Sequence, residues 1–357
     1  MNILQDDNIE NAMSVFRSER QFLDESQVRI PPRPTKSDAP AKEHNIHHKR
    51  PNAGVKIYNL IILIVDILVM AVRWIYHTLE SIYLLVVSPK AEDVSKDVVL
   101  VTGAGHGIGR CLAQQYAQLG ATVVCLDIND KMNNETVAGI KQQRGNAFGY
   151  VCDVTNREQV IETAKAIKEQ VGVVTILVNN AGIMPTHPIL QQTEGEIRKT
   201  IDVNVLAHFW MIQTFLPDMI QRNRGSIVAL SSIAGLVGLN NLVPYCGSKY
   251  AVRGIMEALH EEIRQDARKP NIRLTSVYPY MVDTGLCKKP HMRFPNLMNL
   301  VQPEEAAAAI IDGQRRGLVE VSIPKYLMYL NAFVRVFPLK AGNLLRDFLD
   351  SGVESDM

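Results

Sequence analysis

The chain has 357 residues, of which 46% are hydrophobic and 21% charged, a composition typical of globular proteins. Its 38 Lys and Arg residues stand against 37 Asp and Glu, so the formal net charge of +1 gives no electrostatic case for a nucleic-acid partner. The five cysteines are scattered, with no C-x-x-C pair, which indicates reduced thiols in a cytosol-facing domain and not a disulfide framework.

Residues 1–50 are polar and contain a Pro-Pro-Arg-Pro run at 31–34, a composition that predicts a disordered tail. No charged segment followed by an apolar run and a cleavage site begins the chain, so we expect no cleaved secretory signal. The tail histidines His44, His47 and His48 would be solvated, and we expect no metal site.

A nearly continuous apolar segment follows at residues 57–87. As one helix it would extend about 46 Å at ~1.5 Å per residue, more than the ~30 Å hydrocarbon core of a bilayer. Its apolar surface covers most of the helix circumference, which a soluble core helix does not need. Residues 51–96 are therefore predicted to form a membrane anchor and linker. The polar members of the segment share one stripe: Asn59, Asp66, Arg73, His77 and Glu80.

The charges that flank this segment bear on its orientation. Four basic residues precede it, at 42, 49, 50 and 56, and two follow, at 90 and 96. The positive-inside bias would send the domain after a single span into the lumen, in conflict with reduced cysteines. A monotopic or re-entrant anchor resolves this conflict. We therefore expect a domain that faces the cytosol from the endoplasmic reticulum membrane or a lipid droplet, and glycosylation of the Asn134-Glu135-Thr136 sequon would contradict it.

From residue 97 the chain alternates short β-branched runs with longer amphipathic stretches, the pattern of a parallel sheet with helical crossovers. This pattern predicts one α/β domain over residues 97–323, a doubly wound Rossmann-type fold with a seven-stranded parallel sheet. Its ligand crevice should lie at the carboxyl ends of the strands. Strands are expected near 97–102, 121–126, 146–152, 174–178, 225–230, 271–277 and 318–323. Helices are expected near 107–119, 130–143, 156–171, 195–222, 245–267 and 303–316.

A glycine-rich turn follows the first predicted strand and opens a helix. Such a turn lets backbone N–H groups and a helix N-terminus meet a pyrophosphate, so it indicates a dinucleotide site. Asp127, at the end of the second strand, can accept both ribose hydroxyls of NAD and would repel the 2′-phosphate of NADP. We expect NAD as the cofactor; NADP remains the alternative because Arg110 and His106 could meet that phosphate. The candidate residues of the turn are Gly103, His106, Gly107, Ile108 and Gly109.

The ends of the third and fourth strands add to this site. Asp153 and Val154 follow the third strand, where the adenine edge would lie. Asn180, Ala181 and Gly182 follow the fourth strand. Small residues there would let the backbone approach the cofactor, and amide groups would tie neighbouring strands together.

Tyr245 and Lys249 stand four residues apart, and Ser231 and Ser232 precede them. Residues four apart share a helical face, so the Lys249 ammonium can lie near the Tyr245 phenol and favour its ionised form. A dinucleotide site together with an activated phenol is what hydride transfer at an alcohol carbon needs. The sequence therefore predicts an oxidoreductase.

These motifs resemble the short-chain dehydrogenase/reductase family in its single-domain form, over residues 97–323. The Gly-His-Gly-Ile-Gly-Arg sequence at 105–110, Asp127 and the hydrophobic leader are similar to the membrane-associated retinol and hydroxysteroid dehydrogenases, the epidermal retinol dehydrogenases above all. The residues that carry the wider resemblance are Thr102-Gly103…Gly107-Ile108-Gly109, Asn179-Asn180-Ala181-Gly182, Asn204, Ser232 and Tyr245-x-x-x-Lys249.

The resemblance implies a role for four catalytic residues. Tyr245 would exchange a proton with the substrate oxygen, and Ser232 would donate a hydrogen bond to that oxygen. Lys249 would stabilise the phenolate and bind the nicotinamide ribose. Asn204 would hold a water that relays protons from Lys249.

The segment after the sixth strand departs from the family. Pro279 is followed by Tyr280 where the family usually has glycine, and tyrosine cannot adopt every glycine conformation. The backbone geometry beside the nicotinamide is therefore in question. Thr284 remains available to contact the carboxamide or a phosphate.

The substrate side is expected to be apolar. Residues 236–242 could form one wall, and a second apolar stretch at 326–337 opens the C-terminal segment 324–357. That stretch fits an interfacial helix that tethers the domain to a bilayer, or else a helix that closes the sheet edge or contacts a second subunit. The loop 280–300 would cover the active site with Met281, Leu286, Met292, Phe294, Leu297, Met298 and Leu300.

We therefore predict a membrane-anchored, NAD-dependent alcohol dehydrogenase that acts on retinol, a steroid or another lipidic alcohol, and the resemblance implies a homodimer. Two alternatives stay open: an NADP-linked carbonyl reductase of lipids, and a non-catalytic lipid-surface scaffold that retains the fold. Apolar pockets discriminate weakly among lipids, so the sequence does not choose among retinoid, steroid and fatty alcohol.

Overall fold

The computed structural model describes residues 53–294 and 299–355. It falls into two parts, residues 1–75 and 76–357, each of which is described by itself. The predictions for the tail 1–50, including its histidines, lie outside the described residues, as do those for Leu297 and Met298.

Helix α2 runs from Ala53 to Val86. Its 34 residues extend about 51 Å at ~1.5 Å per residue. The described side chains are exposed along almost its whole length, and Lys56–Leu84 is long and apolar enough to cross a membrane. Within its polar stripe, His77 Nδ1 lies 3.1 Å from Glu80 Oε2. The predicted helix is confirmed, and its unpacked apolar surface makes it a candidate membrane anchor.

Seven parallel strands form the central sheet, in the order β3-β2-β1-β4-β5-β6-β8. The inner strands are rich in Val, Ile and Leu and buried on both faces, as parallel strands between helical layers must be. The order reverses between β1 and β4, which places the ligand crevice at their carboxyl ends. The predicted sheet is confirmed. Its strands are β1 (Val98–Thr102), β2 (Thr122–Asp127), β3 (Asn146–Val151), β4 (Ile176–Asn179), β5 (Gly225–Leu230), β6 (Ile272–Pro279) and β8 (Glu320–Ile323).

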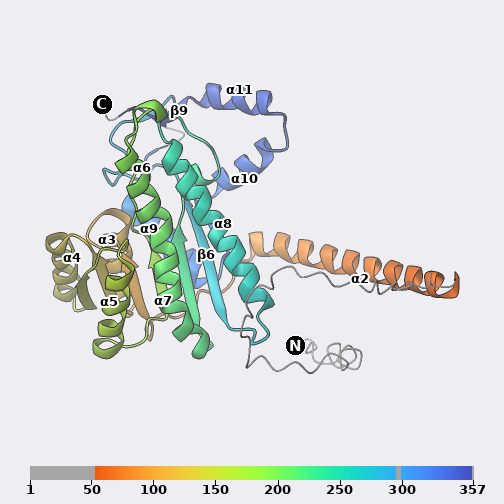
Figure 1. Ribbon diagram of the computed structural model, residues 1–357, viewed down its shortest axis with the longest axis horizontal. Helices are drawn as coiled ribbons and strands as arrows, with labels where there is room; N and C mark the ends of the chain where they lie inside the picture. Colours follow the sequence, from red (N-terminus) through yellow and green to blue (C-terminus); the bar gives the residue numbers. More distant parts are fainter. Residues whose placement is uncertain (1–52, 295–298, 356–357) are drawn as a thin grey trace, which may run out of the picture. The chain divides into compact units, whose positions relative to one another are not determined.

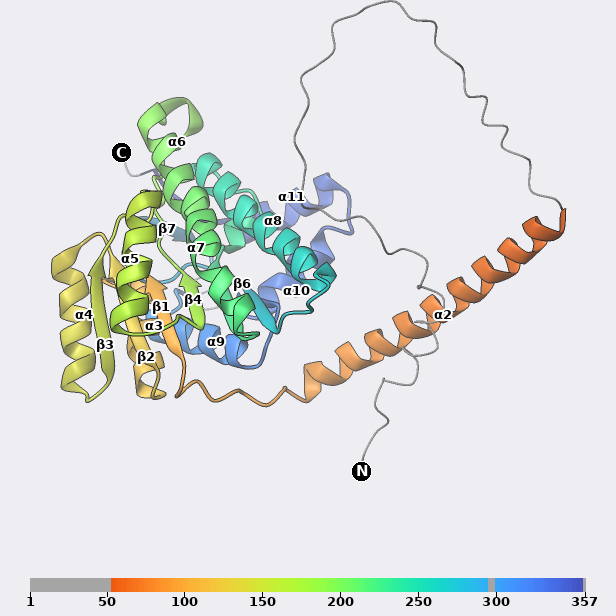
Figure 2. The ribbon, with the colours of Figure 1, turned by 60° about the horizontal axis from the view of Figure 1, so that its bottom comes forward.

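Helices cover both faces of this sheet (Figure 1). One hydrophobic cluster joins the sheet to α3 (Gly107–Gln118), α4 (Asp130–Gln142) and α9 (Pro303–Arg315). A second cluster joins the opposite face to α5 (Arg157–Gln170), α7 (Ala207–Gln221) and α8 (Val243–Gln265). Figure 2 shows α5, α7 and α8 on one side of the strands and α9 on the other.

The helix predicted near 195–222 is divided into three pieces. Helix α6 (Glu194–Ile201) is followed by the π-helix η2 (Asp202–Leu206), and α7 continues from Ala207. Thr193 caps α6 with a reciprocal Thr193–Glu196 capping box. A single π-turn inside a helix is uncommon and often marks a functional site. Here it contains Asn204.

The C-terminal region holds elements that the sequence did not predict. Helix α10 (Tyr326–Val334) lies in the predicted apolar stretch, but α11 (Leu339–Leu349) was not expected. Neither were the short strands β7 (Pro290–Met292) and β9 (Ser351–Val353), which pair antiparallel.

Helix α10 closes against the domain on one side only. Leu327 is buried, and Arg335 Nη2 donates to Leu236 O at 2.8 Å and to Tyr250 Oη at 3.0 Å. Tyr329 and Phe333 remain exposed on the other side. The stretch therefore packs on the domain at the loop before α8 and at α8 itself, and its interfacial role stays a prediction.

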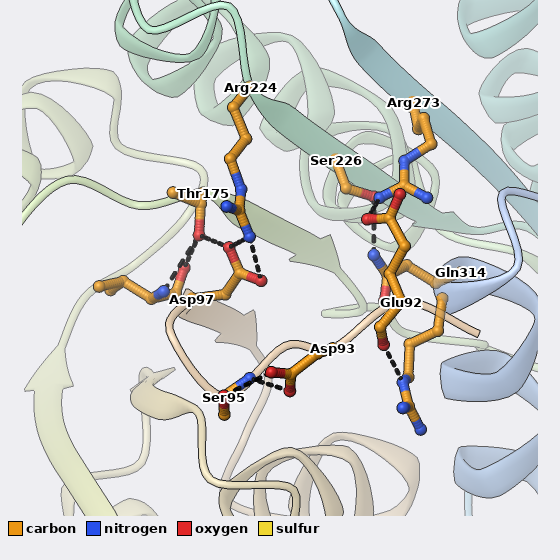
Figure 3. Close-up of polar contacts among 11 residues, drawn as sticks. Glu92, Asp93, Ser95, Asp97, Thr175, Arg224, Ser226, Arg273 and Gln314 are labelled. Carbon is orange, nitrogen blue, oxygen red and sulfur yellow. Dashed lines mark hydrogen bonds and ion pairs between the residues drawn. The ribbon is translucent and has the colours of Figure 1, made fainter. Parts of the chain in front are cut away.

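The segment before β1 is bound to the amino ends of the strands, opposite to the crevice (Figure 3). The buried Asp97 carboxylate accepts hydrogen bonds from Thr175 Oγ1 at 2.8 Å and from Arg224 Nη2 at 2.9 Å. Glu92 pairs with Arg273 of β6, and its carbonyl accepts from Arg315 Nε at 2.7 Å. These contacts fix the point at which the chain enters the domain.

Candidate active site

A cavity of about 1290 Å³ opens at the carboxyl ends of the strands. It is lined by nearly every residue that the sequence singled out, from the glycine turn to the catalytic candidates. Two of the catalytic and cofactor-binding candidates do not line it, and neither do Leu236, Met292, Phe294 and Leu300, which were predicted for its apolar side. Gly109 and Asn204 lie behind its wall, where they pack or bind the residues that do.

The glycine turn between β1 and α3 depends on close backbone contacts. Gly103 and Gly107 have φ values of +66° and +53°, a left-handed conformation that glycine adopts at little cost. A Cβ on Gly109 would lie 2.0 Å from Gly103 O, so only glycine lets α3 approach the turn this closely. A Cβ on Gly107 would lie 2.9 Å from Thr284 Cγ2, which places Thr284 directly against the turn.

The Asp127 carboxylate is held at the end of β2. Its Oδ2 atom accepts from Gly105 N at 2.8 Å, and its Oδ1 atom accepts from Asn129 N at 2.9 Å. The side chain is half-buried and lines the cavity. The Arg110 side chain points away from this cavity, because its Nε atom donates to Gly105 O at 3.0 Å and its Nη2 atom lies 3.5 Å from Glu135.

The ends of β1 and β4 are tied together by side chains, as the sequence predicted. Asn180 Nδ2 donates to Thr102 O at 2.8 Å, and Thr102 Oγ1 accepts from the backbone N–H groups of Asn180 and Ala181 at 2.9 and 3.0 Å. This leaves Ala181 and Gly182 on the cavity wall. Asp153 and Val154 line the same cavity beyond β3, where the Asp153 carboxylate accepts from Thr155.

Asn204 is fully buried in the π-helix, and both ends of its amide are engaged. Its Oδ1 atom accepts from Ile183 N at 2.9 Å, and its Nδ2 atom donates to Ile183 O at 2.9 Å and to Ser248 Oγ at 3.0 Å. The water that the resemblance assigns to Asn204 stays a prediction. The amide fixes the segment after β4 beside α8.

The adjacent serines have different environments. Ser231 is buried, and its hydroxyl donates to Lys249 O at 2.8 Å. Ser232 lines the cavity, its hydroxyl donates to Pro279 O at 3.3 Å and accepts from Ala234 N at 3.1 Å, and this hydroxyl acts to lower the pKa of the Tyr245 phenol. Of the pair, only Ser232 therefore faces the phenol, in agreement with the prediction.

Tyr245 and Lys249 lie in the first turns of α8 with both side chains buried. Lys249 Nζ lies 5.6 Å from the Tyr245 ring centroid and donates to Leu230 O at 2.8 Å. Burial raises the pKa of Tyr245 to about 12, although the Ser232 hydroxyl acts in the opposite direction. Burial lowers the pKa of Lys249 to about 8. In the protein alone, the loss of water on burial therefore outweighs the other causes, and the role of Lys249 in ionising this phenol stays a prediction.

Tyr280 resolves the question raised by the missing glycine. The backbone φ angle of Tyr280 does not lie in the left-handed region. Its N–H donates to Ile323 O at 2.8 Å, which continues the pairing of β6 with β8. The position therefore does not need glycine. The Tyr280 side chain lines the cavity, and burial raises its pKa while the nearby Ser351 hydroxyl acts to lower it.

Comparison with known proteins agrees with this geometry. The family described as short chain dehydrogenase matches residues 97–292. Epidermal retinol dehydrogenase 2 of Mus musculus is 37% identical over 80% of this chain and 92% of its own length. The 17-beta-hydroxysteroid dehydrogenase 13 of Homo sapiens is 35% identical over 79% and 93%. The chain belongs to the short-chain dehydrogenase/reductase family. The predicted family and its retinol and hydroxysteroid dehydrogenase branch are confirmed.

A solved structure shows the same fold. The crystal structure of a short chain dehydrogenase/reductase from Burkholderia phymatum in complex with NAD superposes with a TM-score of 0.63 at 23% identity. The superposition covers 69% of this chain and 95% of the Burkholderia phymatum chain. The Rossmann-type α/β domain is therefore the fold of this family member.

The sequence missed the part of this short-chain dehydrogenase/reductase cavity formed by α10, α11 and β9. Nothing in the composition of these segments says that they return to the site. Lys199 and Asp202, from α6 and η2, also line the cavity and were not predicted. The C-terminal residues that line it include Leu327, Leu330, Val334, Leu345, Leu349 and Val353.

The buried Lys249 amine gives a pH-dependent stability. Its pKa is about 8 in the folded protein against 10.5 ordinarily, so between these values the unfolded chain binds a proton that folded Lys249 has released. The free energy of unfolding should then rise with pH across this window, relative to a Lys249→Met variant that lacks the group. Thermal unfolding of both proteins in detergent across pH 7–10 checks this. A difference in Tm that does not change with pH would contradict it.

Proposed function

We propose that this protein is an NAD-dependent oxidoreductase that interconverts a lipidic primary or secondary alcohol, of the retinol or steroid class, and its carbonyl by hydride transfer. One observation carries the proposal. Ser232, Tyr245 and Lys249 line a single cavity that has a glycine turn with a carboxylate on one side and an apolar wall on the other. The first side suits a dinucleotide, and the second suits a lipid.

Tyr245 is the proton donor and acceptor in this proposal. Its raised pKa of about 12 keeps the phenol protonated at neutral pH, ready to donate to a carbonyl oxygen during reduction. Oxidation needs the phenolate, and a bound oxidised nicotinamide supplies a positive charge and the hydride acceptor. Ser232 donates to the substrate oxygen. Lys249 holds positive charge near the phenol and binds the nicotinamide ribose.

Asn204 acts as a positioning residue. Its amide closes a two-way hydrogen bond with Ile183, so it holds the strand end at Ala181 and Gly182 in place. A Cβ on Gly182 would lie 3.3 Å from Asn204 Oδ1 and 3.6 Å from Lys249 Nζ. Asn204 therefore holds the backbone at Gly182 at a fixed distance from the Lys249 amine.

The residues present fit NAD better than NADP. Asp127 faces the cavity with a carboxylate that would repel a 2′-phosphate, and Arg110 is engaged with Gly105 and Glu135 outside it. His106 is the remaining candidate for that phosphate; it is exposed at the N-cap of α3. The pyrophosphate would meet the N-terminus of α3, with Gly103, Gly107, Ile108 and Thr284 around it. Asp153 and Val154 would border the adenine, and Asn180 and Pro279 the nicotinamide end.

The substrate side favours a lipid delivered from a membrane. Helices α10 and α11 turn Leu330, Val334 and Leu345 into the cavity and expose Phe333 and Leu344 on the outside. An apolar outer surface next to an apolar cavity suits contact with a bilayer.

With α2 as the anchor, the domain would face the cytosol from the endoplasmic reticulum or a lipid droplet. Glycosylation at Asn134, an exposed residue of α4, would contradict this placement. The homodimer stays a prediction.

Replacement of Tyr245 with Phe tests the reaction. Membranes that carry the protein should form NADH from NAD and all-trans retinol, and Tyr245→Phe should lower this rate by at least about 100-fold because the proton donor and acceptor is lost. Binding of NAD should persist in the variant. Tyr245-dependent turnover of a steroid alcohol but not of retinol would support the mechanism and assign the protein a steroid substrate. NAD binding without turnover of any lipid alcohol would favour the scaffold alternative.

Replacement of Asp127 tests the cofactor. Asp127→Asn should raise kcat/KM for NADP relative to NAD by about tenfold or more, since two charges ~4 Å apart near a protein surface interact by roughly 1–4 kcal/mol. Asp130→Asn is the matched control, because Asp130 is exposed and does not line the cavity. An unchanged preference in Asp127→Asn, or wild-type turnover that already favours NADP, would count against NAD as the cofactor.

A further inference from the structure

The end of the described chain returns to the active site as a strand. Residues 351–353 pair with residues 290–292, with Val353 opposite Pro290 and Ser351 opposite Met292. Glu354 N extends the pairing by donating to Lys289 O at 3.0 Å, and Arg293 N donates to Asp350 O at 3.2 Å. Figure 1 shows β9 at the end of the domain where α8 begins, the helix that carries Tyr245.

Two further loops hold the same strand from other sides. Asn241 Nδ2 donates to Val353 O at 2.9 Å, and Asn241 itself has a left-handed backbone with φ +60°. Ser355 Oγ donates to Thr186 O at 3.4 Å. The strand is therefore held by the segment after β6, by the loop before α8 and by the loop after β4, and its position is determined by all three.

Val353 belongs to the apolar cluster that contains Tyr245. It is buried in a small apolar cluster with Tyr245, Leu242 and Met281, and it also lines the cavity. The cluster is separate from the two clusters that hold the sheet. The Val353 side chain is therefore part of the cavity wall, within the same apolar cluster as Tyr245.

We propose that Val353 determines specificity, because its side chain sets the size of the substituent that the carbinol carbon can carry next to Tyr245. The inference rests on the proposed function of the same site and names one wall of its substrate pocket. A primary alcohol places only hydrogen on that side of the carbon, and a secondary alcohol must fit a carbon group there. The strand is anchored through backbone and Asn241 contacts, so the wall keeps its place when the Val353 side chain is changed.

The test uses three alcohols that share one alkyl chain and differ at the carbinol carbon: decan-1-ol, undecan-2-ol and tridecan-4-ol. With full-length protein in detergent and NAD, Val353→Ala should raise the ratio of kcat/KM for tridecan-4-ol to that for decan-1-ol by about tenfold, the effect of one or two methyl groups in a pocket. Val353→Phe should lower the same ratio. Val319→Ala, a half-exposed valine at 51% away from the cavity, is the matched control and should leave the ratio unchanged.

A second variant tests the position of the strand separately from the volume of the Val353 side chain. Asn241→Gly tolerates the left-handed backbone and removes the donor to Val353 O, so it should shift the ratio in the same direction as Val353→Ala.

Equal ratios in wild type, Val353→Ala and Val353→Phe would overturn the proposal, and so would a uniform loss of turnover with all three alcohols. The rise in Tm on binding each alcohol with NAD gives the same ranking without turnover. The wild type could turn over none of the alcohols while the rise in Tm on binding them still depends on the size of residue 353. That result would refute the proposed reaction and support Val353 as the wall of the binding pocket.

Discussion

The site depends on a constraint of space at the point where the strand order reverses. Gly109 must lie against the Gly103 carbonyl, because a Cβ there would come within 2.0 Å of that oxygen. Asn180 then joins the ends of β1 and β4 through Thr102. With these contacts in place, helix α3 aims its N-terminus at the crevice, and the backbone after β4 forms the opposite wall. The close approach at Gly109 sets one wall of the crevice, and the hydrogen bonds between Asn180 and Thr102 set the other.

The chemistry on the far side of this crevice is set by burial. Tyr245 and Lys249 share a low-dielectric environment, and each is shifted toward its neutral form: the phenol to a pKa of about 12 and the amine to about 8. At neutral pH the phenol of such a pair is protonated and the amine is still mostly charged. A positive charge placed in the crevice would favour the phenolate, and this couples cofactor binding to the proton chemistry.

Much of this architecture could be predicted from the sequence, because its signals are local. Short β-branched runs between amphipathic stretches predicted seven parallel strands, and the spacing of Tyr245 and Lys249 predicted that both lie on one helical face. What failed was non-local. The π-turn around Asn204 and the return of Val353 to the apolar cluster of Tyr245 depend on packing between segments far apart in the chain. The pKa of Tyr245 also depends on total burial, which no pair of residues reveals.

The central claim is that hydride moves from an alcohol carbon to a nicotinamide ring beside Tyr245, and isotope transfer tests it most directly. The protein would be given NAD and a lipid alcohol deuterated at the carbinol carbon, such as retinol labelled at its terminal carbon. Mass spectrometry of the recovered NADH would locate the label. We predict one deuterium in NADH formed by the wild type and none above background with Tyr245→Phe. NADH without deuterium, or equal labelling by the variant, would contradict the account.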